Sequence, residues 1–124
     1  MTRPVHPALP WIGVAAAPLA WVVQLIAGYA FQEAGCAPGS GTPVLDLDTE
    51  PWIAAVSAMA IAAAVVGIAS SVVTLRAATR DREADPRGRI AFMGDVGVLV
   101  STIFLAVIVL GAVALPALDA CHPG

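Results

Sequence analysis

The sequence predicts an all-α membrane protein with three transmembrane helices in an antiparallel up-down-up bundle, with the N-terminus inside and the C-terminus outside. Two observations predict this class. The chain is 59% hydrophobic and 12% charged, with a mean hydropathy of +0.86, far more apolar than an ordinary soluble domain of this length. It also holds three apolar runs, each with at least the roughly 20 residues that cross a bilayer as a helix.

The three runs divide one membrane domain, residues 1–124, into spans and connections. We expect helices at about 11–32, 52–75 and 90–115, a periplasmic loop at 33–50, a cytoplasmic loop at 76–89 and a periplasmic tail at 116–124. Spanning strands are excluded, because the runs lack alternating polarity and three strands cannot close a barrel in which every backbone group is paired.

The first span begins at Pro10-Trp11, a proline at a helix start followed by an aromatic residue suited to the membrane interface. Ala20, Gln24 and Gly28 follow at a spacing of four, so they share one helix face. Small residues flanking an amide predict a packing face on which Gln24 hydrogen-bonds to a neighbouring helix. The alternative is a role for Gln24 in a ligand or proton path.

The second span follows Asp48, Thr49 and Glu50, which offer capping oxygens and negative charge at a helix N-terminus. Within it, Ala63, Gly67 and Ser71 repeat at a spacing of four. Small residues in this pattern allow two helix backbones to approach closely, so we expect a contact within the chain or with a partner.

The third span places Gly94, Gly97 and Ser101 near one face, which we also expect to pack against a helix. Asp95 lies beside that face, about 7 to 8 Å along the axis from Ile90 at a rise of 1.5 Å per residue. An acid near the interface is favoured there by the helix N-terminal dipole and by nearby arginines. The functional alternative is a charge pair between Asp95 and an arginine of a partner subunit.

The arginines set the expected orientation. The connection at 76–89 holds five of the six basic residues, all of them arginine, and the connection at 33–50 holds none. Short loops rich in arginine stay on the cytoplasmic side, so 76–89 is expected inside and 33–50 outside.

This orientation brings Cys36 and Cys121 to the same outer side of the membrane. Disulfides persist in the bacterial periplasm or outside the cell, and we therefore favour a Cys36–Cys121 disulfide over two free thiols. The segment Glu33-Ala34-Gly35-Cys36 also looks like the end of a lipoprotein signal. Glu33 is charged where such a signal has an apolar residue, and the apolar run is longer than a signal-peptide core. Both features disfavour a lipid-anchored Cys36.

Several function classes are disfavoured by the residues. A net charge of -3 gives no basic surface for nucleic acid. No histidine lies in a predicted span, so the chain cannot supply two histidine ligands to a haem within the membrane. The chain also shows no nucleophile with its base and no glycine-rich phosphate loop. We expect neither catalytic residues nor a metal or cofactor in this chain.

Two stretches, "APLAWVVQLIAGYAFQEAGC" and "FMGDVGVLVSTIFLAVIVLGAVALPALDAC", carry a family resemblance. They resemble small multi-span membrane proteins encoded in bacterial cytochrome c oxidase gene clusters. The shared positions are Pro18, Leu19, Ala20, Trp21, Gln24, Gly28, Tyr29, Cys36, Gly97, Ser101, Phe104, Ile108, Pro116 and Cys121. The polar position of the first helix is often histidine in that pattern, so Gln24 departs from it and argues against a metal or haem role there.

The resemblance implies a multi-pass protein of the bacterial inner membrane in the setting of a haem-copper terminal oxidase. The chain would be a non-catalytic accessory or assembly subunit that packs against larger integral membrane subunits, and haem and copper would belong to those partners. Two alternatives remain. One is a self-associating protein, a channel or a holin-like homo-oligomer; the other is a periplasmic thiol redox helper that cycles Cys36 and Cys121.

Overall fold

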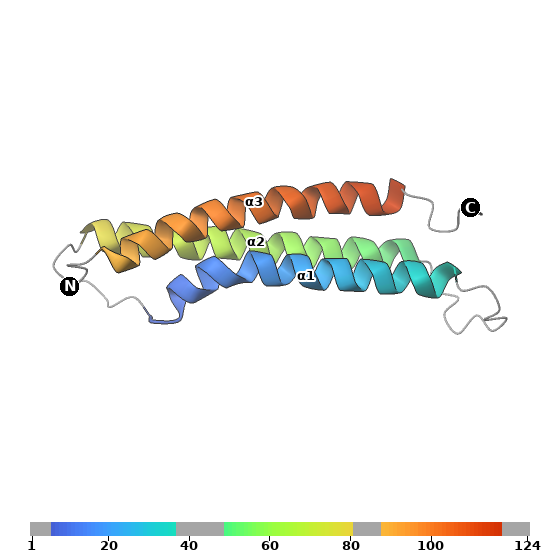
Figure 1. Ribbon diagram of the computed structural model, residues 1–124, viewed down its shortest axis with the longest axis horizontal. Coiled ribbons are helices and arrows are strands. Elements are labelled where there is room, and N and C mark those ends of the chain that lie inside the picture. The colour runs from blue at the N-terminus through green and yellow to red at the C-terminus, as the bar shows by residue number, and fades with distance from the viewer. Residues whose placement is uncertain (1–5, 37–48, 81–87, 118–124) are drawn as a thin grey trace.

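Three long helices make up almost all of the part of the chain that the computed structural model describes, residues 6–36, 49–80 and 88–117. They are α1 (Leu9–Cys36), α2 (Thr49–Arg80) and α3 (Arg89–Ala117), and they lie side by side along one long axis (Figure 1). Each is long and apolar enough to cross a membrane. The prediction of an all-helical fold with three helices long and apolar enough to span a membrane is therefore confirmed.

Each helix is longer than the span predicted for it. The lengths are 28, 32 and 29 residues, about 40 to 50 Å at a rise of 1.5 Å per residue, compared with about 30 Å of hydrocarbon. Hydropathy marks only the part of a helix that meets lipid, whereas backbone hydrogen bonds continue the helix into the interface. At the end of α2, residues 76–80 include good helix formers, and Arg80 in the last turn interacts favourably with the helix dipole.

Local groups satisfy the starts of two helices. Ahead of α1, His6 accepts hydrogen bonds at its Nδ1 from the amide of Ala8 (3.2 Å) and at its carbonyl from the amide of Leu9 (2.9 Å). Ahead of α3, Gly88 has a φ of 65°, a left-handed conformation that glycine adopts without steric cost, and its carbonyl accepts the amide of Phe92 at 2.9 Å. The two bonds to His6 supply partners to amides that a helix N-terminus leaves free, whereas the bond to Gly88 is the first backbone hydrogen bond of α3 itself.

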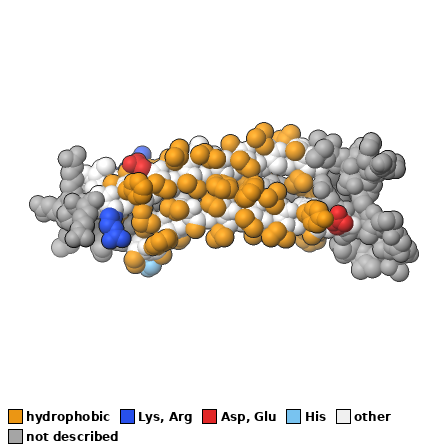
Figure 2. Space-filling view, viewed as in Figure 1, with side chains coloured by type: hydrophobic (Ala, Val, Ile, Leu, Met, Phe, Trp, Pro, Cys, Tyr) orange, Lys and Arg blue, Asp and Glu red, His pale blue; other side chains and the backbone are white. Residues whose placement is uncertain are grey.

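The polarity of this bundle is the reverse of that of a water-soluble one. Large apolar side chains point outward, including Trp11, Leu19, Ile26, Met59, Phe92 and Leu110. Figure 2 shows hydrophobic side chains over the middle of one face, with acidic (red) and basic (blue) side chains towards its two ends. Polar side chains are buried among the helices instead: Gln24, Ser57, Ser70, Ser71, Thr74 and Ser101. A surface of this kind is suited to lipid or to another membrane protein.

The apolar part of the interior is small and tightly packed. Ala17, Ala60, Ala64 and Ile108 form its buried cluster, and Trp21 and Phe104 pack against that cluster. The Trp21 and Phe104 rings meet edge to face at a centroid distance of 5.5 Å, which joins α1 to α3. Nearer the end of α1, the Phe31 and Trp52 rings stack at 6.3 Å and join α1 to α2. Alanine thus brings the backbones close, and aromatic rings fill the wider gaps.

Candidate functional site: the polar packing contacts between the helices

All three helices meet at a cluster of glycine and serine residues, which we call the glycine-serine contact: Gly13, Gly67, Ser71, Gly97 and Ser101. Ser101 of α3 donates its hydroxyl proton to the Gly13 carbonyl of α1 at 2.8 Å. Ser71 of α2 donates to the Gly67 carbonyl of its own helix at 2.9 Å. The Ser71 hydroxyl occupies the space that a Cβ atom on either Gly13 or Gly97 would need. The backbones can approach this closely because these two positions lack side chains.

A second contact between the three helices is centred on Gln24, which is 3% exposed. Its Nε2 lies 3.2 Å from the hydroxyl oxygen of Ser57 on α2 and 3.2 Å from the carbonyl oxygen of Ile108 on α3. Gly111 leaves room beside the amide, since a Cβ added there would lie 3.6 Å from its nearest atoms. One side chain of α1 therefore hydrogen-bonds to both other helices.

The predicted packing residues lie on the inward-facing sides of their helices. Gln24, Gly28, Gly67, Ser71, Gly94, Gly97 and Ser101 are buried, while Ala20 and Ala63 are half-buried. Gly28 packs against Leu115, and Gly94 packs against the backbone and Cβ of Leu75. The three separate faces expected from the sequence are thus brought together, with serine, glycine and glutamine at their points of closest approach.

Asp95 and the cysteines stand apart from these contacts. Asp95 is exposed on α3, and it has no ion-pair partner among the described residues. Cys36 is the last residue of α1, but its side chain and the whole of Cys121 lie outside the described residues, as does Pro116 beyond its backbone. The Cys36–Cys121 disulfide therefore stays a prediction.

Gly13 and Ser57 were not predicted from the sequence, although both are central to the packing. Gly13 and Ala17 continue the face of Ala20, Gln24 and Gly28 towards the start of α1 at spacings of three to four residues. The face of Ala20, Gln24 and Gly28, extended by two turns towards the start of α1, includes Gly13. Ser57 lies six positions before Ala63, in a run rich in small residues, and nothing in its local pattern marks it as the partner of Gln24.

The arrangement supplies hydrogen bonds for packing. Every buried side-chain nitrogen or oxygen among the described residues has a hydrogen-bond partner. In the same part of the chain, no group of three or more His, Cys, Asp or Glu side chains is arranged to hold a metal ion. Thr74 and Ser71 bond to carbonyls of their own helix, which satisfies their hydroxyls within the apolar span.

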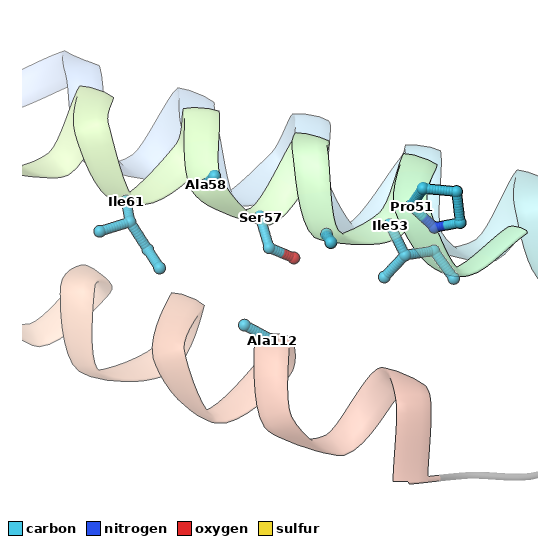
Figure 3. A pocket seen from close by; sticks show the side chains of 7 residues that line it. Pro51, Ile53, Ser57, Ala58, Ile61 and Ala112 are labelled. Carbon is cyan, nitrogen blue, oxygen red and sulfur yellow. The ribbon is translucent and has the colours of Figure 1, made fainter.

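A groove of about 640 Å³ opens between α2 and α3. Figure 3 shows Ile53, Ser57 and Ile61 of α2 directed towards α3, with Ala112 of α3 facing them. Pro51, Ala54 and Ala58 complete the lining, which is apolar apart from the Ser57 hydroxyl. The groove therefore suits a hydrocarbon chain or an apolar side chain.

The serine-to-glycine hydrogen bond between α3 and α1 gives a direct test of the glycine-serine contact. Replacing Ser101 by alanine is expected to lower the free energy of unfolding by about 1 kcal/mol, because the interhelical bond to the Gly13 carbonyl is lost. Thr79→Ala is the control, since Thr79 is exposed and donates to the Arg76 carbonyl of its own helix at 2.9 Å. Unfolding of both variants in mixed micelles checks this; equal losses would contradict the role given to Ser101.

Apolar faces turned outward and satisfied polar groups turned inward define a multi-pass α-helical membrane protein. The chain has no significant match to a family model, to a curated protein or to a solved structure.

Proposed function

We propose that this chain is a non-catalytic accessory or assembly subunit of a membrane respiratory complex that acts through transmembrane helix packing. The observation that carries the proposal is the distribution of polar groups. Those inside the bundle are engaged in holding its own helices together, as the two bonds of Gln24 illustrate. The outward surface is apolar along the spans, so what the chain offers to other molecules is a large surface for helix contacts within the membrane.

The proposal includes an antiparallel, up-down-up arrangement with the N-terminus inside. Contacts support alternating directions: Gly13, early in α1, meets Ser71, late in α2, while Gln24, later in α1, bonds to Ser57, earlier in α2. The arginines of 76–89 support the cytoplasmic placement of that connection.

Reporter fusions test the orientation. A periplasmically active reporter is expected to be active when fused after Gly124 and inactive when inserted within 81–87, because the arginine-rich connection stays inside. The opposite pattern would overturn the orientation and, with it, the argument that Cys36 and Cys121 share an oxidising compartment.

A haem-copper terminal oxidase of the bacterial inner membrane is the complex we propose, on the strength of the sequence resemblance. Positions that carry the resemblance in the first and third helices lie in contact with each other: Trp21 meets Phe104, and Gln24 bonds to the Ile108 carbonyl. The residues that carry the resemblance are divided between α1 and α3 in the sequence, but they pack against each other in the bundle. Haem and copper would be held by the partner subunits, and a Cys36–Cys121 disulfide would tie α1 to the chain after α3.

Purification from the native host in mild detergent tests the proposal. Tagged protein is expected to bring down larger integral membrane subunits, and the eluate to show haem a or haem b absorption bands. Recovery of the chain without haem proteins would contradict the oxidase assignment. An unrelated tagged multi-pass protein from the same membranes serves as the control for nonspecific recovery.

A further inference from the structure

Two exposed residues of opposite charge lie next to a close contact between α2 and α3. A Cβ added to Gly94 would lie 3.0 Å from the Cβ of Leu75 and 3.1 Å from its backbone, so these two residues mark where the helices touch. Arg76 and Asp95 are the next residues along each helix, and both are exposed. One residue turns a helix by about 100°, and in helices that run in opposite directions this turn carries both side chains to the same side of the pair.

That side faces away from α1. Ser71 and Gly97, which contact Gly13 of α1, lie on the other side of the α2–α3 pair. We call the side with Arg76 and Asp95 the α2–α3 outer face. Further exposed residues lie on it, among them Ala58, Val65 and Ala69 on α2 and Thr102, Val109 and Val113 on α3. Ala58 and Arg76 are 18 positions apart (76 − 58), as are Asp95 and Val113 (113 − 95), a separation of about five helical turns.

The two charges also lie at nearly the same depth. Each is one residue from the Leu75–Gly94 contact, in opposite directions along the axis, so their Cα atoms differ in depth by about 3 Å. Phe92 and Leu99, on either side of Asp95 in α3, are 68% and 62% exposed. Neither charged side chain has an ion-pair partner among the described residues. Charges exposed beside apolar side chains close to the membrane interface are stabilised by an opposite charge nearby.

We propose that a second copy of this chain covers the α2–α3 outer face in a two-fold symmetric dimer, with Asp95 of each copy opposite Arg76 of the other. The arrangement of the charges favours an identical partner. Two copies insert in the same orientation, so their two-fold axis runs along the membrane normal. A rotation of 180° about that axis places the α3 side of one face opposite the α2 side of the other. One negative and one positive charge per face then form two reciprocal pairs.

The remainder of the outer face is compatible with this contact. In the dimer, Thr102 of one copy is level with Ala69 of the other, and Val113 is level with Ala58, at the same offset as Asp95 and Arg76. The small side chains at 58 and 69, on either side of Val65 along this face, allow the close approach that membrane helices use. Ala58 also lines the groove of about 640 Å³ between α2 and α3, so Val113 of the second copy is placed to fill it. The dimer depends on the alternating helix directions proposed above and not on the oxidase assignment.

Co-purification of two differently tagged copies, expressed together and extracted in mild detergent, tests the dimer. Wild-type copies are expected to recover each other. Asp95→Arg in both copies is expected to lower that recovery about tenfold or more, because arginine would then face Arg76 of the other copy. Trp11→Arg is the matched control: Trp11 is exposed on α1, away from this face and near the depth of Asp95, so recovery should be unchanged.

A charge exchange between copies separates pairing across the dimer from pairing within one chain. A copy with Asp95→Arg and a copy with Arg76→Asp each hold like charges internally, but together they restore both pairs across the dimer. Mutual recovery of this mixed pair should return to the wild-type level, while each variant alone stays low. Failure of this rescue would overturn the dimer. It would also be overturned if wild-type copies do not recover each other and lipid or another protein covers this face instead. The last outcome would leave the accessory-subunit proposal standing.

Discussion

Leucine in place of Gly97 is expected to lower the free energy of unfolding by about 3 kcal/mol or more, the largest effect of a single substitution that the packing predicts. A Cβ at this position would overlap the Ser71 hydroxyl and lie 3.0 Å from the Ser71 Cβ and 3.3 Å from the Gly13 carbonyl carbon. All three atoms belong to the short Ser71 side chain or to the Gly13 backbone, and they cannot move aside as a long side chain would. The three helices must therefore separate, and the Ser101 bond to Gly13 is lost with them. Steric trapping or reversible denaturation in mixed micelles would measure the change.

Gly111→Ala is the matched control, because its Cβ would meet the Gln24 amide at an ordinary contact distance of 3.6 Å and should alter stability by less than about 0.5 kcal/mol. A second comparison isolates the Ser71 hydroxyl. Ser71→Ala removes the nearest atom to a new Cβ at position 97, so Gly97→Ala should be less destabilising in that background than alone. Equal losses of unfolding free energy from Gly97→Ala and Gly111→Ala would show that the helices do not meet as described. So would the absence of any rescue of Gly97→Ala by Ser71→Ala.

Leucine in place of Gln24 is expected to reduce the free energy of unfolding by about 1 to 2 kcal/mol, the next largest effect. Leucine keeps much of the volume of glutamine but cannot donate to the Ser57 hydroxyl or the Ile108 carbonyl, so both interhelical bonds of this side chain are lost. Gln24 is 3% exposed, and neither bond can be replaced by water at the protein surface. The same unfolding measurement in mixed micelles would give the loss.

A double-mutant cycle assigns that loss to the bonds. Gln24→Leu should cost less when Ser57 is already alanine, with a coupling of about 0.6 to 1.7 kcal/mol for an interhelical hydrogen bond in a membrane protein. Gln24→Asn is a further comparison, since it retains the amide on a shorter side chain that cannot span the same distance. Additive effects of Gln24→Leu and Ser57→Ala would mean that these residues do not interact.

Local patterns were sufficient to predict the three helices. Long apolar runs identify membrane spans because any spanning segment must satisfy its backbone hydrogen bonds internally. The apolar runs did not give the ends of the helices, because α1 continues to Cys36 and α2 continues to Arg80, beyond the apolar residues. Spacing along one helix likewise placed Gln24 and Ser71 on inward-facing sides.

Which residues pair across helices could not be predicted in this way. The bond from Gln24 to Ser57 spans 33 positions, and that from Ser101 to Gly13 spans 88, so no local period connects them. Their pairing depends on the relative shift of the helices, which is set where glycine allows the closest approach. The face beside Asp95 illustrates the same point. Sequence spacing placed Asp95 near a packing face, but only the Leu75–Gly94 contact brings it to the same side and depth as Arg76.

The amount of assembled terminal oxidase in a host strain that lacks this chain tests the central claim, that the chain acts by helix packing in a respiratory complex. Membranes of that strain are expected to show weaker haem a or haem b absorption and lower oxidase activity than wild-type membranes. The wild-type chain and Gly111→Ala should restore both, whereas Gly97→Leu, which disrupts the packed helices, should not. Unchanged haem absorption and oxidase activity in the absence of the chain would contradict the claim.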